Sequence, residues 1–143
     1  MIIFKNLKLI ICIIIYCLPQ QAFSARLFAE KTYQDYWCKK CGGTTEYKLQ
    51  DNTRVDCVID DYAIEFDFAN KWSESIGQSL YYSHCLNKKA GVVLIMENIE
   101  KDTKYLNRLL KVANLHNITV WTITPNELAL STKNYQHTFI NKN

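Results

Sequence analysis

Two neighbouring segments, 54–59 and 62–68, constrain the fold of this chain more than any other part of the sequence. Apolar and polar side chains alternate along both segments, which is typical of strands with two different faces. Asp60 and Asp61 lie between them and are residues that tight turns favour. The pattern therefore predicts an antiparallel hairpin, with a loop of two residues or of four centred on the same point.

This hairpin places acidic residues opposite one another. Asp56 lies directly opposite Glu65, and Arg54 lies opposite Asp67. Directly opposed Cβ atoms are roughly 4.5–5.5 Å apart, so Asp56 and Glu65 can share one divalent ion. Without a cation the two carboxylates repel each other. A loop one residue longer or shorter would turn one strand over and separate them.

The remaining segments complete an α/β pattern. They predict a helix over 26–40 that ends at Gly42 and Gly43, a short strand over 46–49, a helix from an Asn70 cap to about Asn87, a buried strand over 92–96, an amphipathic helix over 102–114 and a buried strand over 118–123. The order α-β-β-β-α-β-α-β predicts a mixed sheet flanked by helices on both faces. We expect one domain over residues 25–124 and a polar, mostly irregular tail over 125–143.

The N-terminus has the features of a secretory signal peptide. Lys5 and Lys8 precede an apolar run over 9–18, and small residues follow at Ala22 and Ser24. The run is too short to span a bilayer, which needs about 20 residues. We expect cleavage after Ser24, a mature protein that begins at Ala25, and export to the periplasm or the cell exterior without stable membrane insertion.

Removal of residues 1–24 also changes the charge. It takes away two of the 17 basic residues and none of the 14 acidic residues, so the mature chain carries 15 basic residues against 14 acidic ones and a net charge of +1. This is not the overall positive charge of a typical nucleic-acid-binding domain. Any binding of DNA or RNA would use a local patch.

The element order and the acidic residues together resemble the PD-(D/E)XK nuclease-like superfamily, over roughly residues 26–124. That group includes restriction endonucleases, Holliday-junction resolvases and many inactive relatives. The resemblance implies a metal-dependent phosphodiesterase fold in which Asp56 is the first metal-binding acid and Glu65 is the second. The family lysine stands two residues after the second acid, where this chain has Asp67. With Asp67 as a third carboxylate, Mg²⁺ or Mn²⁺ is the expected ion.

The helix after the second strand adds three candidate site residues. Gln78 and Tyr82 match the Q-x-x-x-Y signature of the exonuclease-like branch of that superfamily. Lys71 shares a helix face with them by i, i+4 and i, i+7 spacing and can replace the missing lysine. The alternative interpretation makes Lys71 a solvated residue, Arg54 and Asp67 an ordinary ion pair, and Gln78 and Tyr82 ordinary packing residues.

Four cysteines remain in the mature chain, where an oxidising compartment favours disulfides. Alternation turns Cys57 to the face of the sheet opposite Asp56. The first helix can pack against that face, and its end would then bring Cys38 close to Cys57. We therefore expect a Cys38–Cys57 disulfide, and the pairing of Cys41 and Cys85 stays open. The C-x-x-C spacing of Cys38 and Cys41 also suggests a redox motif, but such motifs normally follow a strand and open a helix.

Three functions follow from these patterns. The first is an exported nuclease-like enzyme that acts on nucleic acid. The second is a catalytically inactive form of the same fold that serves as a binding or structural protein. The third, less favoured, is a thiol-disulfide protein that uses Cys38 and Cys41.

Overall fold

The computed structural model describes residues 25–129, and the predicted signal peptide and residues 130–143 of the predicted tail lie outside this range. The elements are α2 (Glu30–Lys40), β1 (Thr44–Lys48), β2 (Arg54–Val58), β3 (Tyr62–Phe68), the 3₁₀ turn η1 (Ala69–Lys71), α3 (Trp72–Leu86), β4 (Lys89–Ile95), α4 (Ile99–Ala113) and β5 (Thr119–Ile123). The predicted α/β class and element order are confirmed.

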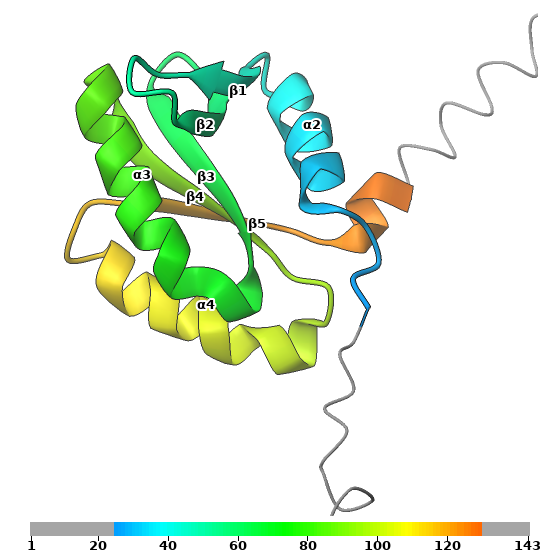
Figure 1. The fold of residues 1–143 in the computed structure, drawn as a ribbon. Coiled ribbons are helices and arrows are strands. Elements are labelled where there is room, and N and C mark those ends of the chain that lie inside the picture. The colour runs from blue at the N-terminus through cyan, green and yellow to red at the C-terminus, as the bar shows by residue number, and fades with distance from the viewer. Residues whose placement is uncertain (1–24, 130–143) are drawn as a thin grey trace, which may run out of the picture.

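The strands form one mixed sheet in the order β1-β2-β3-β4-β5. Strand β2 runs antiparallel to β1 and β3, whereas β3, β4 and β5 are parallel. Helix α2 covers one face, and α3 and α4 lie side by side on the other (Figure 1). No helix among the described residues is both long enough and apolar enough to cross a membrane.

Strand β3 shows how the two faces are filled. Ile64, Phe66 and Phe68 belong to the core beneath α2, together with Tyr33 of that helix. Ala63 belongs to a small core on the other face, where it packs with Tyr82 of α3. Because side chains alternate along a strand, Glu65 and Asp67 share the α3 face with Ala63.

Several boundaries differ from the predicted ones, including the starts of β1, β4 and α4, which each lie two or three residues earlier in the chain. Helix α2 begins at Glu30 rather than Arg26, because Ala29 is extended and the preceding residues bond elsewhere. Asn70 does not cap a helix but lies within η1, and its side chain accepts a hydrogen bond from Arg26. Beyond β5, residues 125–129 are helical rather than irregular, and Leu128 is buried in the α2-side core. The folded part therefore extends past the predicted domain end at residue 124.

Glu97, just after β4, holds the segment that precedes α2. Its Oε1 accepts hydrogen bonds from the Leu27 N–H at 2.9 Å, the Phe28 N–H at 3.3 Å and the Tyr33 hydroxyl at 2.9 Å. The side chain of Glu97 is only 12% exposed. The carboxylate of Glu97 thus fixes the N-terminal segment at the edge of the core.

Glu97→Ala is expected to lower the free energy of unfolding by about 2 kcal/mol, because it leaves the partly buried Tyr33 hydroxyl and two backbone N–H groups without their charged acceptor. Urea unfolding measures the change. Glu100→Ala, which alters an exposed residue at the start of α4, is the control and should change stability little. An unchanged midpoint for Glu97→Ala would mean that the segment before α2 contributes nothing to stability.

Candidate functional site

Asp56 lies where β2 separates from β3. The backbone pairs are Val58 with Ala63 and Cys57 with Ile64, which is the predicted register. A continued ladder would next offer Phe66 a backbone carbonyl, but its N–H donates to Asp56 Oδ2 at 2.8 Å. The carboxylate of Asp56 thus replaces a strand partner, and the two strands open at the residue that carries it.

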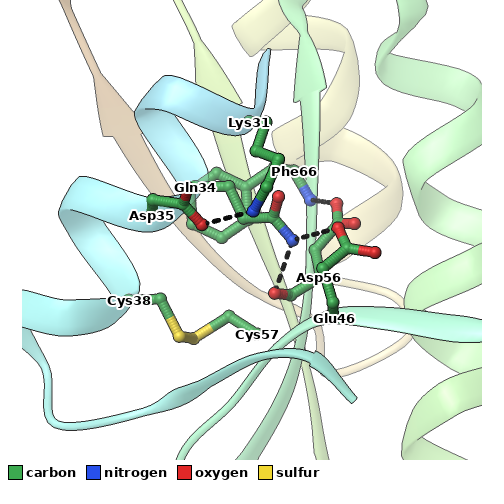
Figure 2. Close-up of a disulfide and its surroundings, with 8 residues drawn as sticks. All are labelled: Lys31, Gln34, Asp35, Cys38, Glu46, Asp56, Cys57 and Phe66. Carbon is green, nitrogen blue, oxygen red and sulfur yellow. Dashed lines mark hydrogen bonds and ion pairs between the residues drawn. A yellow bond between two sulfur atoms is a disulfide. The ribbon is translucent and has the colours of Figure 1, made fainter. Parts of the chain in front are cut away.

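The other side of Asp56 is opened in a similar way. Pairing of β1 with β2 continues on both sides of Glu46 but omits Glu46 and Asp56 themselves. Gln34 of α2 fills this gap: its Nε2 donates to the Asp56 carbonyl at 2.6 Å and to Glu46 Oε1 at 3.1 Å (Figure 2). Glu46 has a φ of 54°, a left-handed conformation that is costly for a residue other than glycine. Such strain persists where surrounding contacts over-determine it, often at functional sites.

Glu65 is the most deeply buried acid of this region. It is 6% exposed, and its Oε2 has no hydrogen-bond partner among the described residues. Burial, together with the charges of Asp56 and Asp67, raises the pKa of Glu65 to about 9. Buried carboxylate oxygens are normally hydrogen-bonded or bound to a cation, so Oε2 of Glu65 is a candidate ligand atom.

Asp56 and Asp67 titrate in the same direction for related reasons. Burial raises the pKa of Asp56, an effect that the Phe66 N–H opposes and the charges of Glu30 and Glu46 reinforce. Burial also raises the pKa of Asp67 to about 7, and Lys71 opposes this shift. The alternative interpretation expected an ion pair between Arg54 and Asp67. Arg54 instead pairs with Glu46, and its Nη1 lies 3.9 Å from Glu46 Oε2.

Glu30, at the start of α2, belongs to this site although the sequence reading did not include it. Burial raises its pKa, and the charges of Lys71 and Arg26 oppose that effect. Its own charge in turn raises the pKa values of Asp56, Glu65 and Asp67. The i, i+4 spacing of Glu30 and Gln34 on one helix face was the available signal.

The three predicted residues of α3 and its entry turn differ in exposure. Tyr82 is 6% exposed and packs in the small core on the α3 face of the sheet, whereas Lys71 and Gln78 are exposed. Lys71 Nζ lies 3.6 Å from Glu74 Oε2 at the surface. Ser75 and Ser79, rather than Lys71 and Gln78, are the fully buried polar residues of this helix. Its predicted inner face is therefore rotated toward the serines.

A divalent ion was predicted on Asp56, Glu65 and Asp67. Among residues 25–129, no three or more His, Cys, Asp or Glu side chains are gathered closely enough to hold a metal ion by themselves. Asp67 Oδ1 accepts a hydrogen bond from the Phe68 N–H at 3.0 Å. Mg²⁺ is commonly held by one or two carboxylates together with water and substrate phosphate. Asp56 and the unpartnered oxygen of Glu65 fit that mode of binding, not an all-protein cage.

Comparison with known proteins identified no relative. No family model matches the chain, and neither a curated protein nor a solved structure matches it. Function must therefore be argued from the chemistry of the site itself.

The predicted Cys38–Cys57 disulfide is present, with Cα atoms 5.8 Å apart and both residues fully buried. It joins the end of α2 to the residue after Asp56 (Figure 2). Cys41 and Cys85 are exposed and pair with no other cysteine of the described residues. Cys38 therefore bonds outside its C-x-x-C motif, and the bond has the buried position of a structural disulfide.

Proposed function

We propose that the protein is a metal-dependent phosphodiesterase that acts on nucleic acid, a divergent form of the PD-(D/E)XK nuclease-like type. The observation that carries the proposal is Oε2 of the buried Glu65, which has no hydrogen-bond partner within residues 25–129 and lies near enough to Asp56 for the Asp56 charge to raise the pKa of Glu65. Two carboxylates whose ionised forms are disfavoured without a cation are the donor set that a hard divalent ion prefers.

Asp56 and Glu65 would hold Mg²⁺ or Mn²⁺ at the opening between β2 and β3. The bound ion would polarise a phosphate oxygen and lower the pKa of a bound water. The chain itself fixes the two ligands: Phe66 and Gln34 hold Asp56 from both sides, and burial in the α3 face holds Glu65. Asp67 lies two residues after Glu65 on β3, and its Oδ1 already accepts a hydrogen bond from the Phe68 N–H. It would therefore add negative charge near the ion without being its principal ligand.

Lys71 supplies the positive charge that Asp67 cannot. Its charge opposes the rise in pKa that burial causes in both Asp67 and Glu30, which supports a role for Lys71 beside the acidic residues. Its only described ion pair is with the exposed Glu74 and is weak, so the ammonium can turn toward a bound phosphate. There it would offset charge that develops during cleavage. Gln78 and Tyr82 lie on α3, which follows Lys71, and would position the nucleic-acid strand.

Asp56→Asn and Glu65→Gln are each expected to abolish divalent-ion binding by calorimetry and to lower metal-dependent cleavage of nucleic acid by at least about 100-fold, the scale of a lost electrostatic group in a catalytic site. Asp60→Asn, on the exposed hairpin turn, is the matched control. Lys71→Ala should lower cleavage similarly while leaving ion binding largely intact. Wild-type protein that binds neither Mg²⁺ nor Mn²⁺ would refute the proposal.

A catalytically inactive protein of the same fold is the second candidate. Asp67 stands where the family has its lysine, and Lys71 is half exposed. The two candidates separate in one experiment, because an inactive form would bind the divalent ion through Asp56 and Glu65 but cleave neither DNA nor RNA. Undiminished cleavage by Lys71→Ala would instead show that another group supplies the positive charge.

The proposed place of action is outside the cytoplasm, reached through the signal peptide over residues 1–24. The buried Cys38–Cys57 disulfide supports this, because stable structural disulfides are typical of oxidising compartments. Mass spectrometry of exported protein should find Ala25 at the N-terminus, and retention of Met1 would contradict the proposed cleavage.

A further inference from the structure

A second feature of the α3 side is a cavity of about 520 Å³. It lies between the loop that follows β1 and the C-terminal half of α3, two segments that are neighbours at one end of the molecule (Figure 1). Its lining includes Tyr47, Lys48, Asp51, Tyr81, His84 and Leu86. A cavity of this size is within the range of small-molecule and nucleotide sites.

The walls of this cavity combine flat apolar surface with a cation. Tyr47 and Tyr81 are the most exposed tyrosines described, at 42% and 44%. Leu86 borders the cavity and packs against the small core that Tyr82 shares with the sheet. Lys48 adds a positive charge at the rim. Aromatic faces next to a basic side chain are the combination that binds single-stranded nucleic acid, by base stacking and phosphate attraction.

Tyr81 is held in position by its hydroxyl group. The hydroxyl donates to Asp51 Oδ2, and Asp51 Oδ1 accepts from the Thr53 N–H at 3.0 Å and from the Thr53 hydroxyl at 2.7 Å. This chain of hydrogen bonds fixes the ring of Tyr81 against the loop after β1. A ring that is already oriented loses less entropy when a base stacks on it.

The cavity is next to the acidic site. Tyr81 and Tyr82 are consecutive, with ring centroids 5.8 Å apart. Tyr82 packs in the small core with Val55 of β2 and Ala63 of β3, on the two strands that carry Asp56 and Glu65. The part of α3 that holds Tyr81 therefore lies against the strands of the acidic site. A nucleic-acid strand with one phosphate near Glu65 can therefore extend toward Tyr81.

We propose that this cavity binds one unstacked base of a single-stranded nucleic acid, between Tyr47 and Tyr81, with Lys48 on the adjoining phosphate. The identity of the ligand rests on the proposed function, and the inference deepens it by naming the substrate class as single-stranded or unpaired ends. A base inside a duplex is stacked on its neighbours and would have to be extruded at a cost of a few kcal/mol.

The test is binding of a short single-stranded oligonucleotide that contains 2-aminopurine, whose fluorescence falls when it stacks on an aromatic ring. The measurement is made in EDTA, which removes divalent ions, so that binding is observed without metal-dependent cleavage of the oligonucleotide. Tyr81→Ala is expected to weaken binding about tenfold and to remove the quenching, because one base–aromatic stack is lost. Tyr81→Phe keeps the ring but loses the hydrogen bond to Asp51 that orients it, so it should keep the quenching and bind with an affinity between those of wild type and Tyr81→Ala. DNA and RNA oligonucleotides are compared in parallel.

Leu115→Ala is the control, because it removes exposed apolar surface from the loop after α4. A duplex of the same sequence should bind at least about tenfold more weakly than the single strand. Wild-type affinity in Tyr81→Ala, or equal affinity for duplex and single strand, would overturn the inference. Tyrosine-dependent binding by a protein that never cleaves with Mg²⁺ or Mn²⁺ would support the cavity and refute the phosphodiesterase, so the two failures are distinguishable.

Discussion

Glu65→Gln is expected to make the metal-free protein more stable by roughly 5 kcal/mol near pH 9, while changing stability little near pH 4. Burial raises the pKa of Glu65 to about 9, well above its ordinary value of 4.5. The wild-type folded state therefore binds more protons than the unfolded state between these values. Its stability is fully present below about pH 4 and is lost as the pH rises through the folded-state pKa. Glutamine does not titrate, so this slope should disappear.

Urea unfolding at a series of pH values measures the effect, with metal removed by EDTA. Glu100→Gln is the control, because Glu100 is an exposed carboxylate on α4 and its replacement should leave the pH slope unchanged. Asp56 and Asp67, whose pKa values burial also raises, contribute pH dependence of the same sign that remains in Glu65→Gln. A wild-type protein whose stability does not fall between about pH 5 and pH 9 would show that Glu65 is solvated.

The same measurement with Mg²⁺ or Mn²⁺ separates a metal site from a buried acid. An ion that binds only the folded state stabilises it by mass action, about 2.7 kcal/mol at 100 times the dissociation constant. Wild-type protein should gain this at neutral and higher pH, and Glu65→Gln should not. Stabilisation of both proteins to the same extent would place the ion elsewhere.

Removal of the Cys38–Cys57 disulfide is expected to cost about 3 kcal/mol. The bond closes a loop with a sequence separation of 19, and a loop of this size contributes about 3 kcal/mol in the chain-entropy account. The double variant Cys38→Ala with Cys57→Ala is measured by urea unfolding. Cys41→Ala with Cys85→Ala is the matched control, because both residues are exposed and have no described disulfide partner.

The disulfide also has a consequence for the site. It joins α2 to β2 next to Asp56, and Gln34 of the same helix donates to the Asp56 carbonyl. Loosening of α2 should therefore weaken divalent-ion binding as well as lower stability. If the disulfide-free protein binds the ion as tightly as wild type, then β3 and α3 alone position the acidic residues.

Much of the central hairpin could be predicted from local pattern. Alternation in 54–59 and 62–68 was enough to predict the pairing of Cys57 with Ile64, and with it the face on which Cys57 meets Cys38. The same register implied that Asp56 and Glu65 come from adjacent strands. These predictions succeed because side-chain alternation and turn length are local properties of a strand pair.

Only the tertiary structure decided how these acids are held. The strands separate at Asp56 because side chains and backbone groups from other elements, Gln34 and Phe66, take over its hydrogen bonds. The left-handed Glu46 and the involvement of Glu30 likewise depend on how α2 packs on the sheet. Lys71 ends the 3₁₀ turn before α3 and is exposed, whereas Ser75 and Ser79 are the buried polar residues of that helix.

The sequence by itself thus determined how the two strands of the hairpin pair and which of their side chains share a face. It could do so because side-chain alternation and hairpin register depend on residues that are close together in the chain. The burial of Glu65, and the lack of a hydrogen-bond partner for its Oε2 in the described part of the chain, came only from the assembled structure. Desolvation depends on every element that packs around a carboxylate, and those elements are distant in the chain. That sum of long-range contacts raises the pKa of Glu65 and makes this acid, rather than Asp67, the centre of the candidate site.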